Sequence, residues 1–106
     1  MNNALAAVRS AQSSPLFGVF MQMYGRIEKK QNANESYVRL VTIINDQLSK
    51  GSRFSSPEVA ASVELLRELA PDGARRRNFE RLYLVDEYTL RKLPKDPRDL
   101  PYGHWY

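Results

Sequence analysis

Start and stop signals of α-helices recur along this chain and leave little room for β-strands. The strongest is Ser55-Ser-Pro-Glu58, which combines a Ser-x-x-Glu capping box with a proline in the first helical turn. Ser14-Pro15 is typical of an N-cap followed by a proline at the first helical position. Lys50-Gly51 suits a helix end, because a cation is favoured there and glycine accepts the left-handed backbone of a stop. Together these signals favour an all-α fold.

Apolar residues follow helical spacing between the signals and predict four successive helices within residues 15–93. The first three stripes are Leu16, Phe20, Met23 and Ile27; Tyr37, Leu40, Val41, Ile44 and Leu48; and Val59, Val63, Leu66 and Leu69. A fourth helix is predicted from Ala74 to Leu93, and it carries more apolar residues than one seam can bury. We therefore expect a small bundle of three to four antiparallel helices, whose last helix leaves apolar surface for a partner.

The last thirteen residues, 94–106, predict an extended, proline-rich tail. Three prolines within eight residues exclude a helix, because each removes a backbone donor and fixes φ. The tail also holds four large or ring-bearing residues, namely Tyr102, His104, Trp105 and Tyr106. Aromatic side chains on such a segment are typical of anchors in another protein surface. The alternative is a tail that lies over the chain's own helices, and the sequence leaves both interpretations open.

The N-terminal segment, residues 1–14, is rich in Ala and Ser, and the first 27 residues contain no Asp or Glu. Leu5 and Val8 lie one helical turn apart and Arg9 is basic, which is the style of an amphipathic mitochondrial targeting segment. A flexible N-terminus is the alternative. The predicted organisation is thus an N-terminal segment at 1–14, a helical domain at 15–93 and an anchoring tail at 94–106.

The composition argues against catalysis and against a bound metal. The chain has no cysteine and one histidine, so a thiolate metal site and a disulfide framework are impossible. His104 lies in the tail, where nothing orients it as a catalytic base. The neighbouring carboxylates Asp86 and Glu87 point about 100° apart on a helix. No apolar run approaches the roughly 20 residues that span a bilayer. We expect a protein that is not an enzyme, has no cofactor, and touches membranes only peripherally.

The sharpest charge feature is Arg75-Arg76-Arg77 followed by Arg81. Arg77 and Arg81 share a helix face and can clamp a phosphate or a row of carboxylates. Three arginines at a helix start oppose the helix dipole, which indicates a compensating anion from outside. Nucleic acid is one candidate anion, an acidic protein or a lipid headgroup is another, and a plain solvated surface is the third interpretation.

Four stretches of the chain resemble the LYR-motif family of small mitochondrial helical proteins. They are Met23-Tyr-Gly-Arg26, Tyr37-Val-Arg39, Phe54-Ser-Ser-Pro-Glu-Val59, and the tail from Lys95 to His104, which is similar to the ending of LYR-type accessory subunits of respiratory complex I. Members of this family are three-helix accessory subunits or assembly factors, and many bind the mitochondrial acyl carrier protein. The resemblance implies an acyl-carrier contact through Tyr24, Arg26 and Arg39.

A competing similarity is to the small helical matrix-side subunit of the cytochrome bc1 complex. It rests on Glu58-Val59, Arg77-Asn-Phe79 and Leu93-Pro-Lys-Asp96. Both resemblances imply a mitochondrial assembly of the respiratory chain and a helical subunit without catalytic residues.

We therefore expect a non-catalytic accessory subunit of a large mitochondrial assembly, with a respiratory-chain complex as the first candidate, in the matrix or at the inner membrane. Its partners would be protein subunits of that complex, contacted through the arginine cluster and the tail, and it would not stand alone as a homo-oligomer. The alternative is a protein of the mitochondrial ribosome that contacts RNA through Arg75–Arg81.

Overall fold

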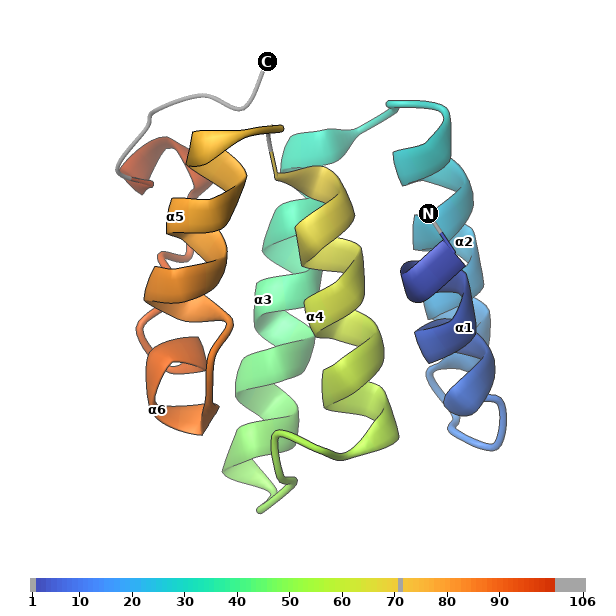
Figure 1. Cartoon of the computed structure of the whole chain (residues 1–106). Helices are drawn as coiled ribbons and strands as arrows, with labels where there is room; N and C mark the ends of the chain where they lie inside the picture. The colour runs from blue at the N-terminus through green and yellow to red at the C-terminus, as the bar shows by residue number, and fades with distance from the viewer. Residues whose placement is uncertain (1, 71, 101–106) are drawn as a thin grey trace.

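The protein is all-α over the residues that the structure describes, as predicted. The computed structural model describes residues 2–70 and 72–100, and it contains no strand in these ranges. Its elements are the helices α1 (Asn2–Ser10), α2 (Phe17–Glu28), α3 (Ala33–Ser49), α4 (Pro57–Leu69), α5 (Ala74–Tyr83) and α6 (Glu87–Leu90), and the 3-10 turn η1 (Pro97–Asp99). Figure 1 shows α1 and α2 on one side, α3 and α4 in the middle, and α5 and α6 on the other side. The described part thus holds six helices, more than the predicted three to four.

Helix α4 is the centre of the fold, because it contacts α1, α2 and α3. Six of its thirteen residues are buried, from Val59 to Leu66. The segment expected to be flexible or amphipathic supplies α1, whose residues Ala4 and Val8 are fully buried. Ala11, in the turn after α1, is fully buried as well. Small side chains at this spacing let α1 lie close against α4, so the N-terminal segment contributes to the core.

The three predicted apolar stripes of the middle helices form most of the core. All five residues of the α3 stripe are buried, from Tyr37 to Leu48, and so are Phe20, Met23 and Ile27 of α2.

The predicted helix starts are less accurate. The Ser14 hydroxyl accepts a hydrogen bond from the Leu16 amide at 3.1 Å, and α2 begins only at Phe17. Ser56, rather than Ser55, precedes α4.

The predicted fourth helix is wrong in its extent, because the chain breaks it between Tyr83 and Glu87. Asp86 adopts an extended backbone, and its side chain accepts a hydrogen bond from the Thr89 amide at 2.9 Å. The Thr89 hydroxyl in turn accepts from the Asp86 amide at 3.1 Å, which completes a capping box for α6. This break turns both Leu84 and Leu90 into the core. One straight helix would leave part of this apolar circumference in water.

The first half of the predicted tail, Pro94–Leu100, lies on the chain's own helices. The buried Tyr37 hydroxyl donates a 2.5 Å hydrogen bond to the Pro94 carbonyl, and η1 contacts α3. Pro97 and Leu100 are buried. Burial raises the pKa of the Tyr37 phenol above its ordinary value, so the hydroxyl stays protonated and remains a donor. The predicted anchors Tyr102, His104, Trp105 and Tyr106 lie outside the described residues.

Two buried serines in the core allow a matched test of hydrogen-bond satisfaction. The Ser36 hydroxyl, in α3, is buried and has no hydrogen-bond partner among the described residues. The equally buried Ser62 donates to the Glu58 carbonyl in α4 at 2.9 Å. Because an unsatisfied buried hydroxyl is costly, we expect Ser36→Ala to raise the free energy of unfolding by up to about 1 kcal/mol. Ser62→Ala should be neutral or destabilising. Urea denaturation measures both, and equal effects of the two changes would contradict this account of Ser36.

Candidate docking surfaces

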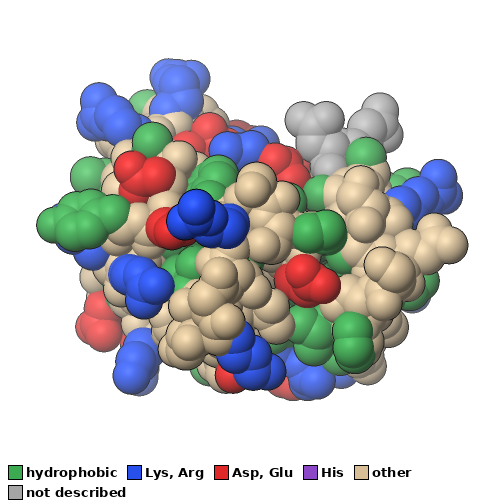
Figure 2. All heavy atoms as spheres, turned by 90° about the horizontal axis from the view of Figure 1, so that it is seen from below, with side chains coloured by type: hydrophobic (Ala, Val, Ile, Leu, Met, Phe, Trp, Pro, Cys, Tyr) green, Lys and Arg blue, Asp and Glu red, His purple; other side chains and the backbone are tan. Residues whose placement is uncertain are grey.

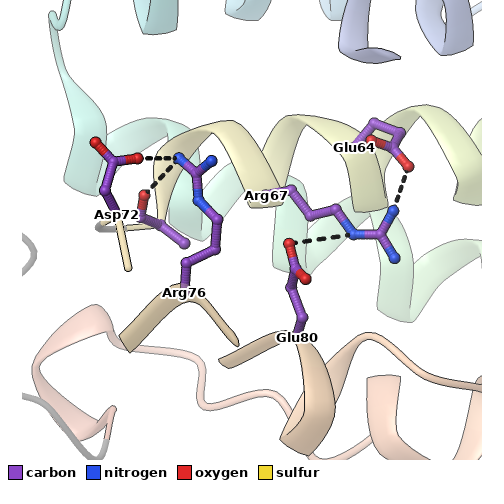
Figure 3. Close-up of polar contacts among 6 residues, drawn as sticks. Glu64, Arg67, Asp72, Arg76 and Glu80 are labelled. Carbon is purple, nitrogen blue, oxygen red and sulfur yellow. Dashed lines mark hydrogen bonds and ion pairs between the residues drawn. The ribbon is translucent and has the colours of Figure 1, made fainter. Parts of the chain in front are cut away.

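The predicted arginine cluster does not form one surface, because Arg76 binds within the chain. Its Nη2 lies 2.9 Å from Asp72 Oδ1 and donates to the Ala70 carbonyl at 3.2 Å, as Figure 3 shows. Asp72 comes just before α5, so it supplies the negative charge that the N-terminus of this helix favours. The anion that compensates Arg76 is therefore part of this chain.

A second arginine, which the sequence interpretation did not single out, ties α5 to α4. Arg67 in α4 pairs with Glu64 at 2.5 Å on its own helix, and its Nε lies 3.7 Å from Glu80 Oε1 in α5 (Figure 3). Since Arg67 and Glu80 are both about two-thirds buried, this pair helps to position α5. Only the helix-to-helix arrangement reveals this ion pair, because Arg67 and Glu80 lie thirteen positions apart in the sequence.

The other three arginines of the cluster are exposed along α5. Arg81 donates to the Asn78 side chain at 3.1 Å, while Arg75 and Arg77 make no ion pair among the described residues. The buried side of α5 is marked by Phe79. Successive helical residues differ by about 100°, so Arg75 and Arg77 diverge from each other around this helix. Three cations remain available to an outside partner, but on a wide arc.

The residues implied in an acyl-carrier contact differ in their availability. Tyr24 is partly buried, and burial followed by the charge of Glu28 raises the pKa of its phenol. Arg26 lies 3.4 Å from Glu35 across the α2–α3 pair, so its charge is compensated within the chain. Arg39 is exposed on α3 and has no ion pair among the described residues. Of the three residues, Arg39 is the one that offers an uncompensated charge.

Arg39 lines an open groove between α3 and the C-terminal segment. The groove has a volume of about 790 Å³, and its α3 wall faces residues 95–98. The residues of the α3 wall are Asn34, Glu35, Val38, Arg39 and Thr42. Val38, which is 44% exposed, gives it an apolar part. Its acids have internal partners, since Glu35 pairs with Arg26, and Asp96 pairs with Arg98 at 2.8 Å. The groove therefore presents the uncompensated cations Arg39 and Lys95, from segments more than fifty residues apart, beside an apolar side chain.

Large apolar side chains are exposed mainly where α5 meets α6. Five are exposed in the described part of the chain, and three of these are Leu82 (44%), Val85 (56%) and Tyr88 (67%). Lys92 lies 4.1 Å above the centre of the Tyr88 ring, a cation–π contact. Figure 2 shows the molecule from below, with the side of α5 and α6 at the left. At this left edge, hydrophobic side chains lie among basic side chains and a few acidic ones. We call Leu82, Val85, Tyr88, Arg81 and Lys92 the α5–α6 tip.

Neither a metal centre nor a membrane span is present in the described ranges. No group of three or more His, Asp or Glu side chains within residues 2–70 and 72–100 is arranged to hold a metal ion. No helix in these ranges is long and apolar enough to cross a bilayer.

Comparisons with family models, with curated proteins and with solved structures find no match to this chain. The resemblances to LYR-motif proteins and to the cytochrome bc1 subunit therefore stay predictions that rest on the residues given above.

Proposed function

We propose that this protein is a non-catalytic accessory subunit of a large mitochondrial assembly, with a respiratory-chain complex as the first candidate. The groove between α3 and the C-terminal segment is the observation that carries the proposal. It holds two uncompensated cations and an apolar side chain, a combination that suits an acidic surface of another protein subunit. An acyl carrier protein is one such acidic partner, and Arg39 would be the residue that contacts it.

The tail contributes a second contact in this proposal. Pro94–Leu100 is held on α3, which fixes the point from which the last six residues start. Tyr102, His104, Trp105 and Tyr106 would enter pockets of a neighbouring subunit, where aromatic side chains supply large contact areas. Because ordering a residue costs about 1–2 kcal/mol in backbone entropy, such an anchor requires extensive burial in the partner.

Native isolation of the tagged chain from the cells that produce it tests the proposal. The tag is placed at the N-terminus in one preparation and at the C-terminus in another, because either end has a predicted role. We expect membrane-bound respiratory subunits to co-purify in fixed ratios. Arg39→Glu combined with Lys95→Glu should lower incorporation at least about tenfold, since like charges across an interface cost several kcal/mol.

The matched control replaces two exposed cations outside the groove, Lys29→Glu and Arg53→Glu. This control should incorporate like the unchanged chain. Recovery of the chain alone, or equal loss in the control, would contradict the accessory-subunit proposal.

A ribosomal protein is the second candidate function, and the exposed Arg75, Arg77 and Arg81 favour it. Co-purification of ribosomal proteins with RNA, in amounts that fall steeply with salt, would replace the first proposal with this one. In that case charge reversal at these three arginines should abolish the association, whereas reversal in the groove should not.

A further inference from the structure

The net positive charge of the chain is concentrated in its C-terminal helical part. Residues 74–95 contain seven of the 16 Lys and Arg residues and three of the 12 Asp and Glu residues, a difference of +4. This equals the formal net charge of the whole chain, +4, so the remaining residues are balanced. The excess charge therefore belongs to α5, α6 and the segment that follows them.

The three acids of this region make contacts within the chain, and one of them, Glu80, faces a cation. Glu80 faces Arg67 at 3.7 Å, and Asp86 accepts the Thr89 amide at 2.9 Å. Glu87 accepts a hydrogen bond from the Phe54 amide at 3.0 Å. By contrast, Arg75, Arg77, Arg81 and Lys92 are exposed. Exposed cations therefore outnumber the exposed acid Asp86 on the surface of α5, α6 and the link between them.

The exposed apolar side chains lie in the same region. Leu82 ends the outer side of α5, Val85 lies in the link, and Tyr88 lies in the single turn of α6. Neither the groove at Arg39 nor a second groove near Gln31 and Leu69 includes a residue of the α5–α6 tip. At the tip, the exposed apolar side chains of Leu82, Val85 and Tyr88 are thus flanked by the exposed cations Arg81 and Lys92.

We propose that the α5–α6 tip inserts into the surface of an anionic lipid membrane. Leu82 and Val85 would enter the boundary of the acyl chains, and Tyr88 would lie at headgroup depth, with its ring in the apolar layer and its hydroxyl in water. Arg81 and Lys92 would contact the lipid phosphates, with Arg75 and Arg77 adding attraction from α5. The inference deepens the proposed function and rests on it for the membrane at which the assembly lies.

The chemistry of the tip favours lipid over the other anionic surfaces. Aliphatic Leu82 and Val85 offer no ring on which a nucleic-acid base can stack, and Lys92 already covers one face of Tyr88. A stable protein interface buries about 800 Å² on each partner, which three partly exposed apolar side chains do not supply. Insertion into a lipid interface requires only a few apolar side chains together with positive charge.

Vesicle binding by the purified full chain tests this inference. One set of vesicles contains phosphatidylcholine only, and the other also contains phosphatidylglycerol. We expect sedimentation with the anionic vesicles alone, weakening as salt is raised. Arg81→Glu combined with Lys92→Glu should lower the affinity at least about fivefold for each reversed charge. The variant with Leu82, Val85 and Tyr88 all changed to Ser should lose binding. The control variant, Met21→Ser with Val38→Ser, removes the other two large apolar side chains exposed among the described residues and should keep binding.

A fluorescent label distinguishes insertion from adsorption, because the chain has no native cysteine. A polarity-sensitive dye on Val85→Cys should brighten on anionic vesicles, whereas the same dye on Val38→Cys should not. Equal binding to neutral vesicles, equal brightening at both positions, or binding to single-stranded RNA but not to vesicles would each overturn the inference. Because the assay contains no protein partner, its failure leaves the accessory-subunit proposal to be decided by native isolation.

Discussion

Replacement of Phe79 by alanine should lower the free energy of unfolding by about 3–5 kcal/mol. Phe79 is fully buried, with 0% of its surface accessible to water, and it is the one buried residue of α5. Its ring packs on Tyr83 at a centroid distance of 5.5 Å. Domains of this size are stable by only about 5–15 kcal/mol, so the change would remove a large part of the total.

Urea denaturation followed by circular dichroism measures this effect. The control is Leu82→Ala, three residues along the same helix but 44% exposed, which should stay within about 0.5 kcal/mol of the unchanged chain. A loss below about 1 kcal/mol for Phe79→Ala, which is no more than an average substitution, would contradict the role of Phe79 in joining α5 to the core.

Two truncations should separate the two roles of the C-terminal segment. Removal of residues 94–106 should cost about 2–4 kcal/mol of stability, because it takes the buried Leu100 and Pro97 out of the core. It also removes the hydrogen bond from the buried Tyr37 hydroxyl to the Pro94 carbonyl, and such a bond contributes about 0.5–1.5 kcal/mol.

Removal of residues 101–106 alone should leave the thermal midpoint unchanged and still reduce incorporation into the assembly. Both chains are compared by thermal denaturation and by native isolation. If the shorter deletion destabilises the purified protein as much as the longer one, the last six residues serve the chain's own fold. If it incorporates fully, the anchoring role of Trp105 and its neighbours is wrong.

The prediction from sequence succeeded where the spacing of apolar residues along one helix determines which residues are buried. The α3 stripe repeats every three to four residues and is bounded by Gly51, and all of its members are buried. The prediction of the fourth helix failed, because the apolar residues from Phe79 to Leu93 also have helical spacing and therefore predicted one continuous helix. The capping box formed by Asp86 and Thr89 interrupts that period, and the spacing Asp-x-x-Thr was a local signal that the periodicity obscured.

The candidate surfaces were predicted less well than the core. Four arginines in seven residues suggested one anion site, yet the fold turns Arg76 back to Asp72 and Ala70. The groove at Arg39 and Lys95 was not predicted, since its two walls are more than fifty positions apart along the chain. Whether the charge of an arginine or lysine is compensated depends on residues that lie far away in the sequence.

The sequence by itself determined the all-α class, the apolar faces of α2, α3 and α4, and the excess of positive charge after residue 73. These properties follow from residue types and from spacing along one element, and both are local. Only the tertiary structure decided that Pro94–Leu100 returns to Tyr37, that Arg39 and Lys95 face one groove, and that Leu82, Val85 and Tyr88 remain exposed. The physical reason is that burial and charge compensation depend on contacts between elements, which the spacing of residues along a single helix does not contain.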